Sequence, residues 1–135
     1  MRLDLVTLVV PSYDSAIAFF VDVLGFSLAA DEPSLTNDGR PKRWVVVRPP
    51  SGGTGLLLAR ADGAAQAARV GDQTGGRVTF FLYVDDFAAA RARLVAAGVS
   101  LVGSVRHEMY GVLQVFDDPF GNRWDLLGPA AAEDV

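Results

Sequence analysis

The chain has 135 residues, of which half are hydrophobic and 21% are charged. This balance and length are typical of one compact globular domain and exclude a disordered chain. The formal net charge is −4, and Lys and Arg form no stripe along the sequence. We therefore expect no nucleic-acid partner, because nonspecific affinity for phosphate backbones comes from clustered basic residues.

Neither secretion nor membrane insertion is expected. Asp4 interrupts the first apolar run, and no stretch reaches the roughly 18 uninterrupted apolar residues that a membrane-spanning helix needs. The sequence contains no cysteine, which excludes disulfides, a thiolate nucleophile and zinc fingers. A reducing, cytoplasmic location is the prediction.

The first half of the chain predicts a strand, a helix and three further strands. Residues 3–10 are rich in β-branched side chains and precede Pro11, which ends a strand by removing a ladder donor. Ser12 is a suitable helix N-cap and Gly25 a suitable stop. Between them, four apolar residues recur at helical spacing: Ile17, Phe20, Val21 and Leu24. The later strands are expected over 26–30, 44–47 and 55–59, with a polar turn over 33–42.

The second half repeats this order. Residues 78–84 predict a strand, Asp85 the N-cap of a helix, and Gly98 its stop. Gly-Phe-Ser-Leu in the first half returns as Gly-Val-Ser-Leu in the second, which indicates a weak internal duplication. The linker between the halves is rich in Ala, Gly and Gln, and 64–69 within it could form a short helical turn. The remaining strands are expected over 99–103, 112–116 and 123–127, with 118–122 as the last turn.

Two stretches carry a resemblance to a known family. They are Tyr-Asp-Ser-Ala-Ile-Ala-Phe-Phe at 13–20 and Phe-Asp-Asp-Pro-Phe-Gly-Asn-Arg-Trp-Asp-Leu at 116–126. With the repeated element order, they resemble the vicinal-oxygen-chelate superfamily, which has the glyoxalase/bleomycin-resistance fold. The resemblance implies an α+β fold in which two tandem βαβββ modules, about 1–60 and about 77–130, form a cup-shaped mixed sheet in one domain over 1–130. It also implies a pocket for a divalent metal or an apolar ligand, and a homodimer.

The residues at the family's metal-ligand positions do not suit a metal. The resemblance places these positions at Leu5, at Leu57 or Leu58, at Thr79 and at Asp125, so only the last keeps a ligand. The sequence contains one histidine, and a site with two histidines and a carboxylate cannot be assembled within one chain. We therefore expect neither a metal nor another cofactor.

Asp125 is the first candidate site residue. Alternation along 123–127 puts Asp125 on the face opposite Trp124 and Leu126, and the resemblance implies that the Asp125 face lines the cup. A carboxylate there could act as a general base or hold a cationic group, and burial would raise its pKa. The alternative is an ion pair at the rim with Arg123 or Arg43.

The remaining candidates are aromatic or polar side chains. Alternation turns Thr79, Phe81 and Tyr83 toward the cup, where the two rings could stack on a flat ligand or serve as core or dimer interface. Trp44 could cap the mouth of the cup or be structural. Gln114 is expected on the cup face as a ligand-orienting amide. His107 is either an acid–base group or simply solvated. The ligand-binding candidates are Trp44, Thr79, Phe81, Tyr83, Tyr110, Gln114 and Asp125; the catalytic candidates are Asp125, His107 and Tyr83.

Three functions are compatible with these residues. The first is a metal-free, dimeric binding protein that sequesters a cationic or aromatic small molecule. The second is an enzyme, either a glyoxalase-like lyase or isomerase or a dioxygenase. The third is an accessory subunit or regulator whose cup only supports dimerisation.

Overall fold

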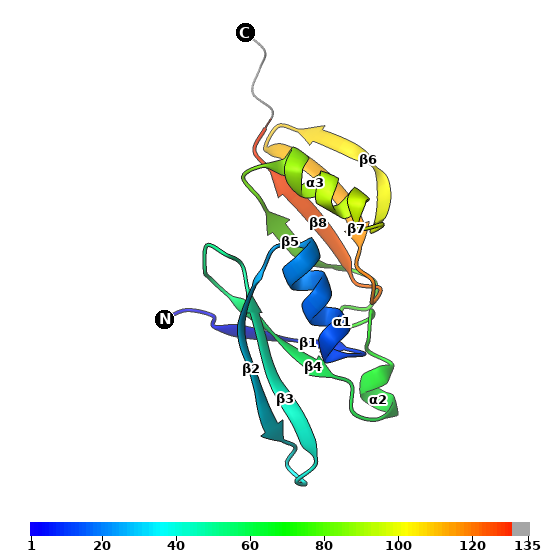
Figure 1. Ribbon diagram of the computed structural model, residues 1–135. Coiled ribbons are helices and arrows are strands. Elements are labelled where there is room, and N and C mark those ends of the chain that lie inside the picture. The colour runs from blue at the N-terminus through cyan, green and yellow to red at the C-terminus, as the bar shows by residue number, and fades with distance from the viewer. Residues whose placement is uncertain (131–135) are drawn as a thin grey trace. The chain divides into compact units, whose positions relative to one another are not determined.

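The computed structural model describes residues 1–130. The chain divides into two compact units, the first over Met1–Val70 and the second beginning at Gly71. Each unit contains a strand, a helical segment and three further strands in that order (Figure 1). The α+β fold and the duplication expected from the sequence are thus confirmed, as two separate four-stranded mixed sheets.

The sheet of the first unit has the strand order β1-β4-β3-β2. Its first strand pairs with its last in parallel, and the other neighbours are antiparallel. The short helix α2 follows the sheet, at the position where a helical turn was expected. The elements are β1 Leu5–Val10, α1 Tyr13–Ile17, η1 Ala18–Val23, β2 Ser27–Leu35, β3 Pro41–Arg48, β4 Gly55–Arg60 and α2 Ala64–Ala67.

The first helix begins as expected, but its second half is π-helical. The Ser12 hydroxyl caps it by accepting a hydrogen bond of 3.3 Å from the Ser15 backbone nitrogen. In η1 the backbone nitrogen of Leu24 donates to the carbonyl of Phe19 at 3.1 Å, a five-residue spacing. The wider turn rotates Phe19 into the core beside Phe20, whereas Val21 and Leu24 are only partly buried. The prediction that Ile17, Phe20, Val21 and Leu24 form the buried face of this helix is therefore only partly right.

The second unit repeats the topology, with the strand order β5-β8-β7-β6. Its helix is capped by Asp86 and not by Asp85, because the Asp86 carboxylate accepts from the Ala89 backbone nitrogen at 3.0 Å. On the helix side of the sheet, Trp124 stacks on Phe116 with 5.5 Å between ring centroids. The elements are β5 Val78–Tyr83, α3 Phe87–Ala96, β6 Ser100–Glu108, β7 Gly111–Asp117 and β8 Arg123–Gly128.

Strands β2, β3 and β6 are longer than the sequence pattern predicted. Of the turn expected over 33–42, residues 33–35 belong to β2 and 41–42 to β3, and only 36–40 connect the two strands. Cross-strand pairing explains the extension: the guanidinium of Arg43 reaches the carboxylate of Asp31 on the neighbouring strand at 2.7 Å. Such pairs let charged residues occupy a solvent-exposed hairpin.

Within residues 1–130, no helix is both long enough and apolar enough to cross a membrane.

Candidate ligand-binding site

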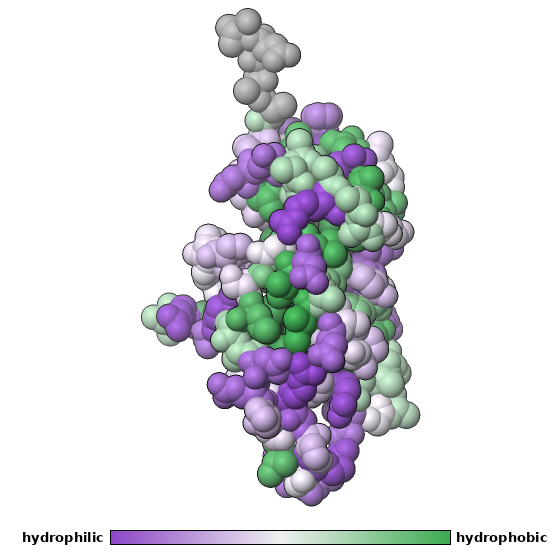
Figure 2. Space-filling view, in the orientation of Figure 1, coloured by the Kyte–Doolittle hydropathy of each residue, from purple (hydrophilic) through white to green (hydrophobic). Residues whose placement is uncertain are grey.

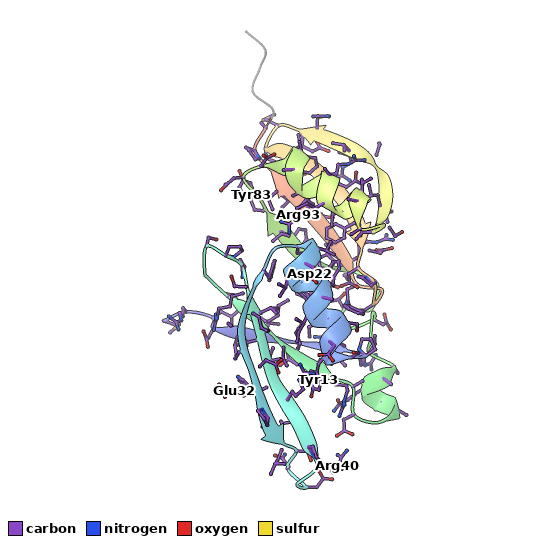
Figure 3. The ribbon with its side chains drawn as sticks, in the orientation of Figure 1. Tyr13, Asp22, Glu32, Arg40, Tyr83 and Arg93 are labelled. Carbon is purple, nitrogen blue, oxygen red and sulfur yellow. The ribbon has the colours of Figure 1, made fainter. Side chains whose placement is uncertain are left out.

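One face of the second sheet carries an acidic group on the strand next to two aromatic rings. Phe81 of β5 and Val115 of β7 both lie in register with Asp125 of β8, and Tyr83 lies opposite Leu127. Residues in register on neighbouring strands project to the same side, so Phe81, Tyr83 and Asp125 share the face that α3 does not cover. The rings of Phe81 and Tyr83 are 65% and 59% exposed, which leaves them available to a ligand. Figure 3 shows Tyr83 at the surface of this sheet.

Asp125 is partly buried on this face and has an unused acceptor. Its Oδ1 atom is enclosed and makes no hydrogen bond within the described part of the chain. Burial raises the pKa of the Asp125 carboxyl, and the positive charge of Arg106 partly opposes that rise. The rim ion pair considered from the sequence is not formed, because Arg123 binds Asp117 at 3.0 Å instead. Asp125 can therefore accept a hydrogen bond from a ligand or form an ion pair with a cationic group of the ligand.

His107 does not join Asp125. It lies opposite Val112, which is on the face of β7 that also carries Gln114 and packs toward α3, whereas Asp125 pairs with Val115 on the other face. Within the second unit, the acid–base pair of Asp125 and His107 is therefore not assembled. Tyr110 is 68% exposed in the β6–β7 connection, beyond the last rung of that hairpin.

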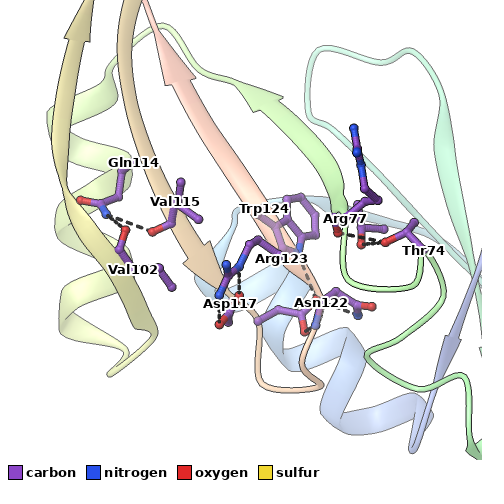
Figure 4. A network of polar contacts seen from close by, with 11 residues as sticks. Thr74, Arg77, Val102, Gln114, Val115, Asp117, Asn122, Arg123 and Trp124 are labelled. Carbon is purple, nitrogen blue, oxygen red and sulfur yellow. Dashed lines mark hydrogen bonds and ion pairs between the residues drawn. The ribbon is translucent and has the colours of Figure 1, made fainter.

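Gln114 does not lie on the open face, so this expectation was wrong. Its side chain is fully buried on the α3 side of the sheet. The Oε1 atom accepts from the Nε atom of Arg91 at 3.0 Å. The amide nitrogen lies within hydrogen-bond distance of three backbone carbonyls, those of Val102, Gly103 and Val115 (Figure 4). With its polar atoms engaged inside the protein, Gln114 is structural and is not free to orient a ligand.

Thr79 lines a small hollow of about 250 Å³ in the second unit. Its hydroxyl lies 3.1 Å from that of Thr74. The ion pair of Asp117 and Arg123 forms part of the same wall (Figure 4). Because this pair satisfies both of its charges, the other polar side chains of the lining are the two threonines and Arg77.

Trp44 lines a larger cavity, of about 450 Å³, in the first unit. Here β3 and β4 separate: their register ends at Val45 opposite Leu58. Beyond that rung, the backbone nitrogen of Arg43 donates to the hydroxyl of Tyr13 at 3.2 Å in place of a ladder partner. The sequence showed a basic run at 40–43, but not that Tyr13 and the end of β4 would meet it. Only Trp44 among the expected ligand-binding residues lies in this cavity.

The family's metal-ligand positions are also distinguishable in the structure. Leu57 lies in register with Thr7 and Val46 on the uncovered face of the first sheet, whereas Leu58 is fully buried in the core. Of the two positions expected for the carboxylate, Leu57 is thus the one that does not lie in the core. Over residues 1–130, no three His, Cys, Asp or Glu side chains are grouped so that they could hold a metal ion.

Two βαβββ units, each with one helix-covered face and one open face, define a paired-module α+β protein. The family model for the Glyoxalase/Bleomycin resistance protein/Dioxygenase superfamily matches residues 2–126, and the chain belongs to this superfamily.

The chain is similar to several individual proteins. It is 46% identical over 123 residues to an uncharacterized protein of Shewanella frigidimarina. That alignment covers 90% of this chain and 89% of the relative. The crystal structure of TnmS3, an antibiotic binding protein from Streptomyces sp. CB03234, matches with a TM-score of 0.73 and 29% identity over 96% of this chain and 97% of that one. A glyoxalase/bleomycin resistance protein from the same Streptomyces matches with a TM-score of 0.68 and 29% identity over 92% and 97%.

Proposed function

We propose that this protein is a metal-free, cytoplasmic small-molecule-binding protein that holds a compound with an aromatic ring and a cationic group. The binding surface is the open face of the second sheet, with Asp125 facing the cation and Phe81 and Tyr83 stacking on the ring. The proposal takes 1–130 as one domain and the active form as a homodimer.

The observation that carries the proposal is the unused carboxylate oxygen of Asp125. A buried acceptor without a partner costs free energy, on the order of 1–3 kcal/mol, and a cation beside the partly exposed side of the same carboxylate would offset that cost. The exposed rings beside it supply flat apolar area, and a cation over such a ring is also attracted by its quadrupole. The similarity to an antibiotic binding protein supports a binding function of this kind.

The test uses two naphthalene probes of nearly the same shape, one charged and one neutral: naphthylmethylammonium and naphthylmethanol. We expect the cationic probe to bind more tightly by calorimetry and to raise the melting temperature more. Asp125→Asn should weaken its binding by at least about tenfold, equivalent to about 1.4 kcal/mol. Phe81→Ala should weaken the cationic and the neutral probe alike, because both use the ring.

Asp72→Asn is the matched control. Asp72 is exposed and lies outside this face, and the substitution removes the same formal charge. If Asp72→Asn weakened the cationic probe as much as Asp125→Asn, net charge and not a site would explain the binding, and the proposal would fail. Sedimentation of the free and ligand-bound protein tests the homodimer.

Acid–base catalysis is the second candidate, and the raised pKa of Asp125 favours it. Asp125 would be the base, and Tyr83 on the same face would donate a hydrogen bond to the substrate. An enzyme would convert its ligand, so recovery of the bound compound unchanged after prolonged incubation would argue for the binding function.

A further inference from the structure

The cavity of the first unit is lined by both apolar and basic side chains. Trp44 and Leu57 are among the apolar ones, and Lys42 and Arg60 are among the basic ones. Tyr13, at the start of α1, also lines the cavity, and its ring centroid lies 5.1 Å from the guanidinium carbon of Arg43 and 5.2 Å from that of Arg60. Figure 3 shows Tyr13 at this position, and Figure 2 shows hydrophilic side chains gathered over this end of the unit.

The charges lining the cavity do not balance. Arg40 binds Asp38 and Asp62, and Arg43 binds two further aspartates. Among the described residues, neither Lys42 nor Arg60 has an acidic group within ion-pair distance. Lys42 is the only lysine of the sequence and is partly buried. The lining itself therefore holds four basic and two acidic side chains, and the two aspartates that bind Arg43 lie just outside it. Lys42 and Arg60 are the basic groups of this lining that are left without an ion pair among the described residues.

The cavity also has a hydrogen-bond donor and a fixed frame. The Oε1 atom of Gln66 accepts from the backbone nitrogen of Asp62 at 2.9 Å, and its amide protons have no acceptor in the described part of the chain. The guanidinium of Arg40 grips the carboxylate of Asp62 through two bonds of 3.0 and 2.7 Å. This bridge connects the β2–β3 turn to the segment after β4, so it holds the two separated strands at a fixed spacing.

We propose that this cavity is a second binding site, which takes a small organic anion: a carboxylate or phosphate attached to a flat apolar group. The oxyanion lies between Lys42 and Arg60, with the amide of Gln66 as a further donor, and the apolar part lies against Trp44 and Leu57. A volume of about 450 Å³ is within the usual range of roughly 300–1,000 Å³ for small-molecule pockets. The inference is independent of the proposed function, since it concerns the other unit and the opposite charge.

The experiment uses the two tryptophans of the chain as separate reporters. Trp44 lines the cavity, whereas Trp124 is buried in the second unit. In nitrogen–proton correlation spectra, we expect naphthoate or naphthyl phosphate to shift the indole signal of Trp44 in a saturable way and to leave that of Trp124 in place. Binding of both probes, or of one, identifies the preferred oxyanion; a Trp44 signal that responds to neither overturns the proposal.

The charge requirement is tested with a double variant. Lys42→Gln with Arg60→Gln should weaken the anionic probe by at least about tenfold, whereas the control pair Arg2→Gln with Arg69→Gln, which removes the same charge at exposed positions outside the cavity, should not. Naphthylmethanol should bind the wild type at least about tenfold more weakly than naphthoate. Equal binding of the charged and neutral probes, or an unchanged affinity in the double variant, would refute an anion site.

A measurement on the wild type covers the case in which the double variant does not fold. Because Lys42 is the only lysine, mass spectrometry can follow its acylation separately from that of the amino terminus. We expect the anionic probe to slow acylation of Lys42 severalfold without slowing that of the terminus. Equal rates with and without the probe would contradict the site.

Discussion

The carboxylate of Asp118 accepts a hydrogen bond of 3.0 Å from the indole nitrogen of Trp124. The same carboxylate accepts from the backbone nitrogens of Phe120 and Asn122, and from the side-chain amide of Asn122. Asp118 is 4% exposed, and it therefore ties the turn before β8 directly to the largest core side chain.

Asp118→Ala should destabilise the protein by about 2–4 kcal/mol, because it leaves several buried donors unpaired. Chemical denaturation measures the loss. Asp117→Ala is the control: its ion pair with Arg123 is partly exposed, so its loss should cost about 1 kcal/mol or less. Equal losses in the two variants would show that the buried acceptor has no special role.

The two adjacent aspartates before α3 should differ in their contribution to stability. Asp86→Ala removes the N-cap acceptor for the Ala89 backbone nitrogen and should cost about 1 kcal/mol. Asp85→Ala should cost only a few tenths of that, since Asp85 does not cap the helix. Thermal unfolding of both variants tests the assignment, and the reverse order would contradict it.

Gln114→Leu should destabilise the fold without affecting ligand binding. The substitution removes the partner of the Arg91 side chain and a donor to buried backbone carbonyls, at a cost of about 2–4 kcal/mol. Urea denaturation gives the stability, and calorimetry on the folded variant gives the affinity for naphthylmethylammonium. A folded variant with normal stability that no longer binds naphthylmethylammonium would show that Gln114 contributes to ligand binding.

The pH dependence of stability should identify the environment of Asp125. Burial raises the pKa of Asp125 in the folded protein above its ordinary value of 3.8, so the folded state holds this proton more tightly than the unfolded chain. The contribution is therefore favourable below the ordinary pKa and is lost as the pH rises through the folded pKa.

Comparison with Asp125→Asn isolates this effect. The difference in free energy of unfolding between the variant and the wild type should be constant at acid pH, where Asp125 is protonated in both states. As the pH rises through the raised pKa of Asp125, the wild type should lose stability and the variant should not. Binding of naphthylmethylammonium to the wild type should strengthen over the same pH range, because the cation prefers the ionised carboxylate. A constant difference in unfolding free energy between the two proteins from acid to neutral pH would contradict a raised pKa.

Much of the fold follows from local patterns. The repeated strand–helix–strand order, the stop glycines Gly25 and Gly98, and the alternation in β8 were all visible in the sequence, and the structure bears them out. These features depend on residues close together in the chain, where hydrophobic period and turn chemistry decide the outcome.

Gln114 shows why a local pattern fails in a strand with apolar residues on both faces. Val112 and Phe116 lie on one face of β7, and Leu113 and Val115 on the other, so alternation does not tell which face is open. The amide can be buried because Arg91, from a helix 23 residues earlier, donates to its oxygen and backbone carbonyls of β6 and β7 accept from its nitrogen.

The sequence by itself determined the two βαβββ units and the shared face of Phe81 and Tyr83, because a strand's two-residue period fixes which of its own side chains project together. That Asp125 joins them on this face depends on the pairing of β5 with β8. The tertiary structure alone decided where β3 and β4 separate. It also decided that Arg40 forms an ion pair with Asp62, whereas Lys42 and Arg60 form none with an acidic side chain of the described residues. Those positions are brought together by chain folding over long separations, and no local period encodes which charges will meet.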